Sequence, residues 1–481
     1  MNKLKKNLSL QVIYQVIATI TPLITSPYLS RKLGASSLGL YSYTYSIISY
    51  FMLFCMMGFV NYGTRSIALL KNNKDEKQIV SEIYAVQLFF CFFSTLLFLI
   101  LLLVSKNKML LIFQSLWILS CFFDVTWYFF GKENFKTTVI RNLIIKLITI
   151  ICIFLFIKNS NDLLKYIIIM GGGTLISQFS LWILVINKIS INKDVIINSF
   201  SHFKPVLLLF IPILAMSIYH IMDKTMLGLL STPSESGFYF NADKVVNIPL
   251  CILTGIGTVM LSNISNLLAK NNSQQAIIVF KKSIKYLGCL SIAMAFGIAG
   301  ISKDFVPLFF GAGYEKCITL VQLLSIVIIF KSISDILRTQ YMIPCKREKY
   351  FIIAVIVGAI VNFILNILFI YYMKLDSLGA TLGTIIAEVV VCILQLIFVN
   401  KDERIVDVLF SNIIFIIFGI IMYSCIIIIS HLAINILIKL LLEIAIGGLI
   451  YVILTLLYFL LKNDEIIKIL KFKYIIKKGM I

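Results

Sequence analysis

The chain has 481 residues, of which 60% are hydrophobic and 14% are charged, and its formal net charge is +21. Soluble domains are about 45–50% apolar and about 25% charged, so this composition excludes a soluble globular protein. Apolar runs of about 20 residues recur along the chain, and that length crosses about 30 Å of hydrocarbon as an α-helix. A β-barrel is excluded because its strands would alternate polar and apolar residues. The sequence predicts an all-α polytopic membrane protein.

The number and direction of the membrane spans follow from the polar breaks and the loop cations. Fourteen apolar runs predict fourteen transmembrane helices, the first two centred near Thr19 and Ser49. The face that holds the N-terminus carries about 29 loop Lys and Arg residues, and the opposite face about nine. Because loop cations favour the cytoplasmic side, both termini are predicted to be cytoplasmic. Because the positive net charge is explained by membrane topology, no nucleic-acid partner is expected.

The first apolar run is interrupted by Pro22 and Pro27, and Leu33-Gly34 is predicted to end it. The run is too long for a signal peptide and is interpreted as a retained first helix. Each proline removes a backbone hydrogen bond one turn earlier, so this helix is predicted to bend. Pro212 interrupts the seventh run in the same way. We therefore expect these prolines to allow a gating motion of helices that line a cavity.

Two pairs of motifs indicate an internal repeat. The segment from Leu33-Gly34 to Tyr41 is similar to the segment from Leu227-Gly228 to Tyr239, and the sequence around Asp124 is similar to that around Asp335. The copies are six helices long, which predicts two parallel six-helix lobes around a central cavity that opens alternately to each face. The predicted parts are an N-terminal lobe at 8–187, a cytoplasmic linker at 188–202, a C-terminal lobe at 203–399, two further helices at 408–461 and a basic cytoplasmic tail at 462–481.

Several charges fall inside predicted spans, where an unpaired charge is costly. Asp124 and Lys146 are expected at similar depth on neighbouring helices, and Lys331, Asp335 and Arg338 share one helical face. One interpretation makes Asp124–Lys146 and Lys331–Asp335 structural ion pairs. The other has the cations face the cavity and bind an anion while the carboxylates moderate their field. The predicted anion-binding cations are Lys146, Arg141, Lys331 and Arg338.

Other charges lie near the predicted outer boundary or alone in a span. Arg31 and Lys224 are predicted to be exit-side contacts, with interface anchoring as the alternative, and Asp223 is predicted to be a charge partner. Glu388 is either a protonatable group for ion coupling or a hydrogen-bonded core residue. Lys439 and Glu443, spaced i,i+4, are expected to neutralise each other. Aromatic residues at helix starts, including Tyr41 and Tyr45, are either interface residues or surfaces that stack on sugars.

The motifs of common soluble catalysts are missing from the sequence. It contains no GxxxxGK[ST], no HExxH and no CxxC, although it has 10 cysteines. No cofactor or metal is expected, and the protein is not expected to be an enzyme. A membrane polymerase or ligase would need a large outer loop with catalytic residues, and no predicted loop exceeds about 20 residues.

Several motifs together carry a resemblance to a known family. They include SPYLSRKLGASSLGLYSY, GFVNYGTRSIA, FDVTWYFFGKENFKTTVIRN, YHIMDKTMLG and NADKVVNIPLCILTGIGTVMLSNIS. From Leu8 to about Asn400 the chain resembles the Wzx-type polysaccharide flippases of the superfamily that includes multidrug exporters and lipid II flippases. The arginines of the first two helices of lipid II flippases have no match, since 11–30 is uncharged and Arg65 lies beyond the second helix.

The resemblance implies a protein of the bacterial cytoplasmic membrane with fourteen helices. It implies a flippase that moves an undecaprenyl-diphosphate-linked oligosaccharide from the inner to the outer leaflet for capsule, O-antigen or exopolysaccharide synthesis. Its partners would be that lipid and the bilayer, with coupling to H⁺ or Na⁺ and contact with a polysaccharide polymerase left open. The alternative is an ion-coupled antiporter of small molecules, as in the multidrug exporters.

Overall fold

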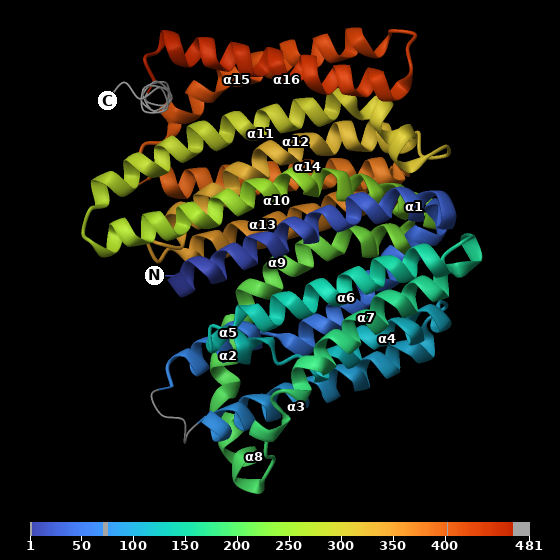
Figure 1. Ribbon diagram of the computed structural model, residues 1–481, viewed down its shortest axis with the longest axis vertical. Coiled ribbons are helices and arrows are strands. Elements are labelled where there is room, and N and C mark those ends of the chain that lie inside the picture. The colour runs from blue at the N-terminus through green and yellow to red at the C-terminus, as the bar shows by residue number, and fades with distance from the viewer. Residues whose placement is uncertain (1, 71–75, 402, 465–481) are drawn as a thin grey trace. The chain divides into compact units, whose positions relative to one another are not determined.

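The computed structural model describes the backbone of residues 2–70, 76–401 and 403–464, and side chains from residue 21 onward with the further exception of 218–220 (Figure 1). Most of these residues are helical, and no strand occurs among them. The prediction of an all-α, multi-pass membrane protein is confirmed by the length and hydropathy of the helices.

Residues 2–70 and 76–230 form nine α-helices and three short 3₁₀ turns. They are α1 (Asn2–Met56), α2 (Phe59–Ala68), α3 (Glu76–Val104), α4 (Lys108–Phe122), α5 (Thr126–Gly131), α6 (Phe135–Phe156), η1 (Ser160–Asp162), α7 (Leu163–Ile183), η2 (Ile186–Lys188), α8 (Lys193–Ser199), η3 (Phe200–His202) and α9 (Phe203–Leu230).

The described part of the second half, 231–401 and 403–464, continues with seven α-helices, two of which are followed by π-helical turns. They are α10 (Pro233–Ala269), α11 (Ser273–Phe310), α12 (Lys316–Leu337), η4 (Arg338–Met342), α13 (Glu348–Asn366), η5 (Ile367–Tyr372), α14 (Asp376–Asn400), α15 (Val406–Ser430) and α16 (Ile436–Leu461).

Thirteen helical stretches within the described residues are long and apolar enough to cross a membrane. The first, Thr21–Ala68, has 48 residues, which is far more than one crossing needs. Gly34 divides it, because its φ of 78° lies in the left-handed region where glycine alone is unstrained. The break falls where Leu33-Gly34 was predicted to end the first helix. Divided there, the thirteen stretches account for the fourteen predicted spans.

The chain packs as two compact units. The first contains Met1–Lys244, Phe310–Gly313 and Ile352–Ala387, and the second contains Val245–Phe309, Tyr314–Phe351 and Glu388–Ile481. These units are defined by contacts and not by the internal repeat. The division of the chain into two six-helix lobes, a linker and two further helices therefore stays a prediction.

Within the first unit, the start of α10 packs against the part of α1 that follows Gly34. A Cβ atom at Gly39 would lie 1.7 Å from the carbonyl oxygen of Pro233, and one at Gly237 would lie 1.9 Å from that of Ala35. Backbones can approach this closely only where a side chain is missing. Gly39 and Gly237 occupy equivalent positions in the predicted repeat, so the two copies contact each other through matching glycines.

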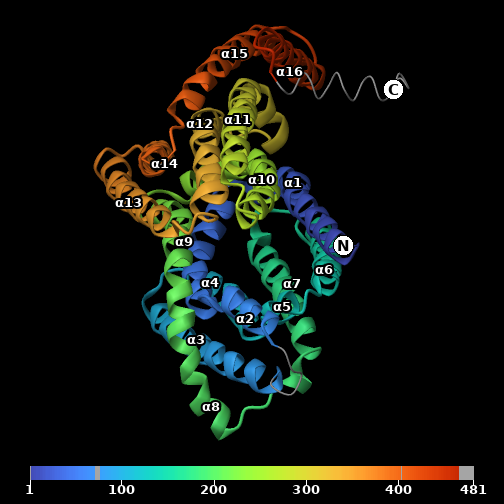
Figure 2. The same cartoon turned by 90° about the vertical axis from the view of Figure 1, so that its left-hand side faces the viewer.

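Within the second unit, α15 and α16 lie side by side (Figure 2) and both pack against α11. Cys289 and Ile292 of α11 share an apolar cluster with Phe415 of α15 and Tyr451 of α16. The Tyr451 hydroxyl donates a hydrogen bond of 2.7 Å to the Cys289 carbonyl. The two C-terminal helices are thus held to α11 by apolar packing with a few polar contacts.

Candidate functional site: a cationic cavity in the first unit

The first unit contains a cavity of about 610 Å³. This volume lies within the range of about 300–1,000 Å³ that is usual for small-molecule sites. Side chains from α1, α4, α6, α7 and the start of α10 line it, and Pro22 of α1 is among them. Transporter sites commonly lie between helices that are interrupted near the binding position, as α1 is here.

Three cations and one carboxylate line this cavity among its described residues: Arg141 and Lys146 of α6, Lys244 of α10, and Asp124. Sequence reasoning predicted that Arg141 and Lys146 bind an anion and that Asp124 moderates their charge. The structure brings these three residues to one cavity and adds Lys244 to them. With three positive side chains and one negative one, the net charge of the lining favours an anionic ligand over a cationic one.

The Arg141 guanidinium is fixed by neutral groups. It donates to the Ser177 carbonyl oxygen at 2.7 Å, to the Gln178 side-chain oxygen at 3.0 Å, and to the Asn142 side-chain oxygen at 2.6 Å. These three acceptors orient the side chain without cancelling its charge. The guanidinium is thereby held at the cavity wall, in a geometry that suits recognition of a phosphate or carboxylate.

Asp124 lies where the fourth predicted helix is broken between Phe122 and Thr126. Its carboxylate accepts hydrogen bonds from the Thr126 amide at 3.0 Å and the Thr126 hydroxyl at 2.6 Å. The Gln178 amide donates a third at 3.1 Å, and the same amide group accepts from Arg141. Gln178 thus connects the carboxylate to the guanidinium. An Asp-x-Thr sequence commonly forms such a turn, and that signal was present in the sequence.

Lys244 is the cavity cation that sequence reasoning left unassigned, because it falls at the edge of a predicted span. Its Nζ lies 3.8 Å from the centroid of the Phe240 ring, one turn earlier on α10. Lys224 of α9 approaches the same ring at 5.7 Å and forms an ion pair of 2.9 Å with Asp243. Asp243 thus offsets the charge of Lys224, and the aromatic ring supports Lys244 at the cavity.

Aromatic side chains form one wall of the cavity. Tyr41 stacks on Tyr45 with ring centroids 5.7 Å apart, and Tyr45 meets Trp117 edge to face at 5.1 Å. Tyr166 packs against Tyr41 at 4.8 Å. Tyr41 and Tyr45 line a cavity rather than only a membrane interface. Rings arranged in this way present flat apolar faces beside the cations.

The predicted exit-side residues have different surroundings in the first unit. Arg31 is exposed and lies beside Gly311. Asp223 is buried, and it accepts hydrogen bonds from Tyr239 at 2.7 Å, Asn366 at 2.6 Å and Thr384 at 2.7 Å. Asp223 therefore joins α9 to α10, α13 and α14 through neutral donors. Pro27 and Pro212 lie inside α1 and α9.

The predicted charges of the second unit are paired in an unexpected way. Lys331 contacts Glu388, with Nζ and Oε1 3.7 Å apart, and Arg338 forms its ion pair with Asp335. Arg338 also lies over the Phe351 ring at 5.4 Å. Lys331 and Asp335 share a helical face, but the partner of Lys331 comes from α14. Sequence spacing along one helix could not reveal this pairing between helices.

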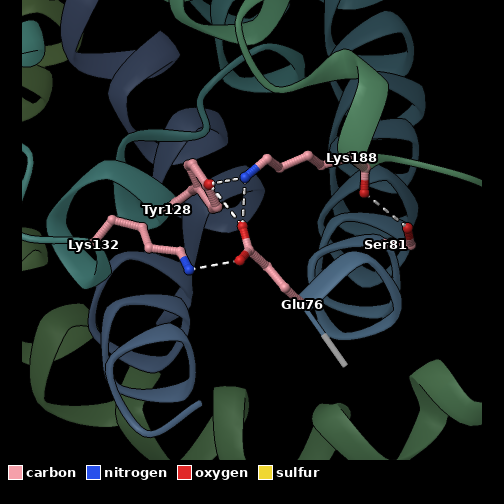
Figure 3. A network of polar contacts seen from close by, with 5 residues as sticks. All are labelled: Glu76, Ser81, Tyr128, Lys132 and Lys188. Atoms are coloured by element: carbon pink, nitrogen blue, oxygen red, sulfur yellow. Dashed lines mark hydrogen bonds and ion pairs between the residues drawn. The ribbon is translucent and has the colours of Figure 1, made fainter. Parts of the chain in front are cut away.

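A further polar network joins the start of α3 to α5 and η2 (Figure 3). Glu76 accepts from Lys132 and Lys188 at 2.6 Å each and from the Tyr128 hydroxyl at 2.8 Å. Hydrogen bonds to Glu76 and then to Tyr128 raise the pKa of the Lys188 ammonium. Sequence reasoning counted these lysines only as topology signals. We refer to Glu76, Tyr128, Lys132 and Lys188 as the α3 clasp.

Comparison with known proteins identifies the family. The family described as "Polysaccharide biosynthesis protein" matches residues 4–267. A putative O-antigen transporter of Escherichia coli (strain K12) is 24% identical over 427 residues, which is 84% of this chain and 100% of that protein. A protein of the same description from Shigella dysenteriae is 24% identical over 401 residues, which is 82% of this chain and 99% of that one.

Solved structures share the fold. The lipid II flippase MurJ in an inward closed conformation has a TM-score of 0.73 at 19% identity, over 93% of this chain and 98% of that chain. An inward-facing multidrug resistance MATE family transporter of the MOP superfamily has a TM-score of 0.63 at 14% identity, over 81% of this chain and 95% of that chain. The matched family segment is more than half of the chain. The protein therefore belongs to the polysaccharide biosynthesis protein family and has the fold of the MurJ and MATE transporters.

Proposed function

We propose that this protein is a flippase that moves an undecaprenyl-diphosphate-linked oligosaccharide from the inner to the outer leaflet of the bacterial cytoplasmic membrane. The observation that carries the proposal is the cavity of the first unit, in which Arg141, Lys146 and Lys244 accompany one carboxylate. A lipid diphosphate has about two negative charges and needs such cations when it leaves water. The curated relatives are described as putative O-antigen transporters, which agrees with this substrate class.

The shape and chemistry of the cavity suit a ligand with two kinds of group. The cations would hold the diphosphate, while Tyr41, Tyr45 and Trp117 offer flat faces against which sugar rings pack. Pro22 lies in the wall, so bending of α1 would change access to the cavity. In this mechanism Pro27 and Pro212 allow the same bending elsewhere in α1 and α9. Lys331 and Arg338 are proposed as a second group of cations that the substrate meets.

An inside-negative membrane potential would help an anionic headgroup to move outward. The contribution is about 2.3 kcal/mol per charge for each 100 mV, so transport in this direction needs no ATP. Both termini would be cytoplasmic, as the loop cations predict. Under this proposal the protein binds and moves its substrate and makes or breaks no covalent bond.

Deletion of the gene followed by lipid analysis tests the proposal. Cells that lack the protein should accumulate the sugar-loaded carrier in the cytoplasmic leaflet, where membrane-impermeant oxidants of sugars do not reach it. Re-expression of the wild-type chain should restore its exposure. A normal distribution of the carrier in the deletion strain, with altered sensitivity to cationic drugs, would instead support the antiporter alternative.

A further inference from the structure

The second unit contains a group of buried charges that the proposed transport cavity does not use. Glu443 of α16 is 0% exposed, and among the described residues no N–H or hydroxyl group donates a hydrogen bond to either of its carboxylate oxygens. It faces Asp304 of α11, which is also buried. The second carboxylate oxygen of Asp304 likewise has no hydrogen-bond partner in the described part of the chain. Two carboxyl groups therefore meet between these helices.

Among the described residues, a single interior lysine, Lys439, is shared between the two carboxyl groups. Its Nζ lies 3.3 Å from the first carboxylate oxygen of Asp304 and donates to the Ser430 carbonyl at 3.1 Å. Lys439 also acts on Glu443, as its i,i+4 spacing predicted, but its ion pair with Asp304 of α11 means that it does not serve Glu443 alone. The other cation that acts on Glu443 is Lys303, whose side chain is exposed. Inside the interface, two carboxylates and one ammonium would leave one negative charge in excess.

The side chains of α15 that pack beside these two carboxyl groups are apolar. Ile426 and Met422 of α15 lie against Gly447 of α16, and Ile426 also packs against Gly300 of α11. Gly447 and Gly300 are each one helical turn from a carboxyl group, so the packing beside the pair is apolar. Two carboxylates that meet in an apolar environment do not both stay ionised, because burial and mutual repulsion favour one bound proton.

The two carboxyl groups lie near one end of each helix. Glu443 is seven residues from the first residue of α16, which corresponds to about 10 Å along the helix axis. Asp304 is six residues before the end of α11, so both helix ends lie on the same side. In the predicted topology this is the outer face. A proton from solvent would therefore travel about two helical turns to reach the pair.

We propose that Asp304 and Glu443 form a proton-binding site between α11 and α16. One proton is taken up from water at the near face and is shared between the free carboxylate oxygen of Asp304 and a carboxylate oxygen of Glu443. While it is bound, the pair with Lys439 is electrically neutral and α16 packs closely on α11. When it leaves, the like charges repel and weaken that contact. This proton-binding site does not depend on which substrate the protein transports.

Infrared spectroscopy of the full chain in lipid nanodiscs tests the site directly. At a mildly alkaline pH, where exposed carboxyls are ionised, the wild-type protein should show the carbonyl stretch of a protonated carboxylic acid. Glu443→Gln should abolish this band, because Asp304 then pairs with Lys439 alone and stays ionised. Asp407→Asn, at an exposed carboxyl near the start of α15, should keep it. A wild-type protein without the band, or a Glu443→Gln protein that retains it, would overturn the proposal.

A second variant and a second ion complete the test. Lys439→Met removes the only interior cation of the described group, so the band should persist to a higher pH than in the wild type. If the band of Lys439→Met disappears at the same pH as the wild-type band, the two carboxyl groups do not share a proton. Wild type and Glu443→Gln are then compared with and without Na⁺ at constant pH. The site binds a metal cation, and the proposal is wrong, if Na⁺ removes the wild-type band and raises the thermal unfolding midpoint of the wild type but not that of Glu443→Gln. The neutral amide of the glutamine variant can donate to Asp304, so folding is expected.

Discussion

Lys244 lies over the ring of Phe240, with its Nζ 3.8 Å from the ring centroid, at the wall of the cavity in the first unit. The ring face attracts the ammonium and holds it without neutralising it. Lys224 is the other cation near this ring, but it forms an ion pair with Asp243. This difference makes Lys244, rather than Lys224, the cation available to an anionic ligand.

Lys244→Met should weaken binding of an undecaprenyl-diphosphate lipid to the purified protein by about ten- to hundred-fold. A hydrogen bond to a charged group contributes about 1.5–3 kcal/mol, and about 1.4 kcal/mol corresponds to a factor of ten. Binding would be measured by titration of a labelled lipid in nanodiscs. Lys193→Met, at the exposed start of α8, is the matched control and should bind as the wild type does. Equal affinity in both variants would remove Lys244 from the site.

Asp124→Asn should have the opposite effect on affinity. The amide still accepts from Thr126, but the negative charge that opposes the ligand is gone. At an effective dielectric constant of about 20 the loss of a nearby repulsion gives severalfold tighter binding of the diphosphate. The same titration measures it. Weaker binding would show that Asp124 supports the cavity mainly through its contact with Gln178.

Gly237→Ala should impair folding of the first unit. The added methyl group would meet the Ala35 carbonyl oxygen at 1.9 Å, and a backbone atom cannot move away as a flexible side chain can. Overpacking of this kind costs about 1–3 kcal/mol or more. The comparison is Gly172→Ala, where no atom lies within 4 Å and helix propensity favours alanine. Thermal unfolding in detergent should show a lower midpoint for Gly237→Ala alone. Identical midpoints would contradict the close contact of α1 and α10.

Glu76→Gln should loosen the α3 clasp. Lys132 and Lys188 lose their carboxylate, so hydrogen exchange of backbone amides in 186–190 should become faster. Asp194→Asn, an exposed carboxyl on α8, is the control and should leave exchange unchanged. The pKa of Lys188 is raised in the folded protein, so its stabilising contribution is complete at neutral pH and is lost as pH rises through the folded value. If hydrogen exchange in 186–190 is unaltered in Glu76→Gln, other contacts hold this segment, such as the hydrogen bond between Ser81 and Ser190.

The expectations that succeeded depend on local or statistical signals. Apolar length revealed the spans, and Leu33-Gly34 marked the end of the first helix because glycine alone adopts its φ of 78° without strain. The charges were harder, because their partners come from other helices. Glu388 reaches Lys331 across helices and Lys439 reaches Asp304. Lys244 was left unassigned because hydropathy alone does not show which side of a helix faces a cavity.

The proposed electrogenic movement predicts a dependence on membrane potential. An inside-negative potential should speed outward flipping of the lipid diphosphate, and its collapse by an ionophore should slow it, since each charge gains about 2.3 kcal/mol per 100 mV. Vesicles with a set potassium gradient allow the measurement. A rate that does not change when the potential is collapsed would mean that the two charges are compensated by a co-transported cation, and the electrogenic proposal would fail.

The central claim is that the cations of the first-unit cavity move a lipid-linked diphosphate oligosaccharide. Its most direct test is the flipping rate of that lipid in proteoliposomes that contain wild type, the double variant Lys146→Met/Lys244→Met, or Lys193→Met. Equal insertion and equal thermal midpoints must first be shown for all three. We predict rapid flipping by wild type and Lys193→Met and a loss of at least tenfold in the double variant. Wild-type flipping by the double variant would contradict the claim.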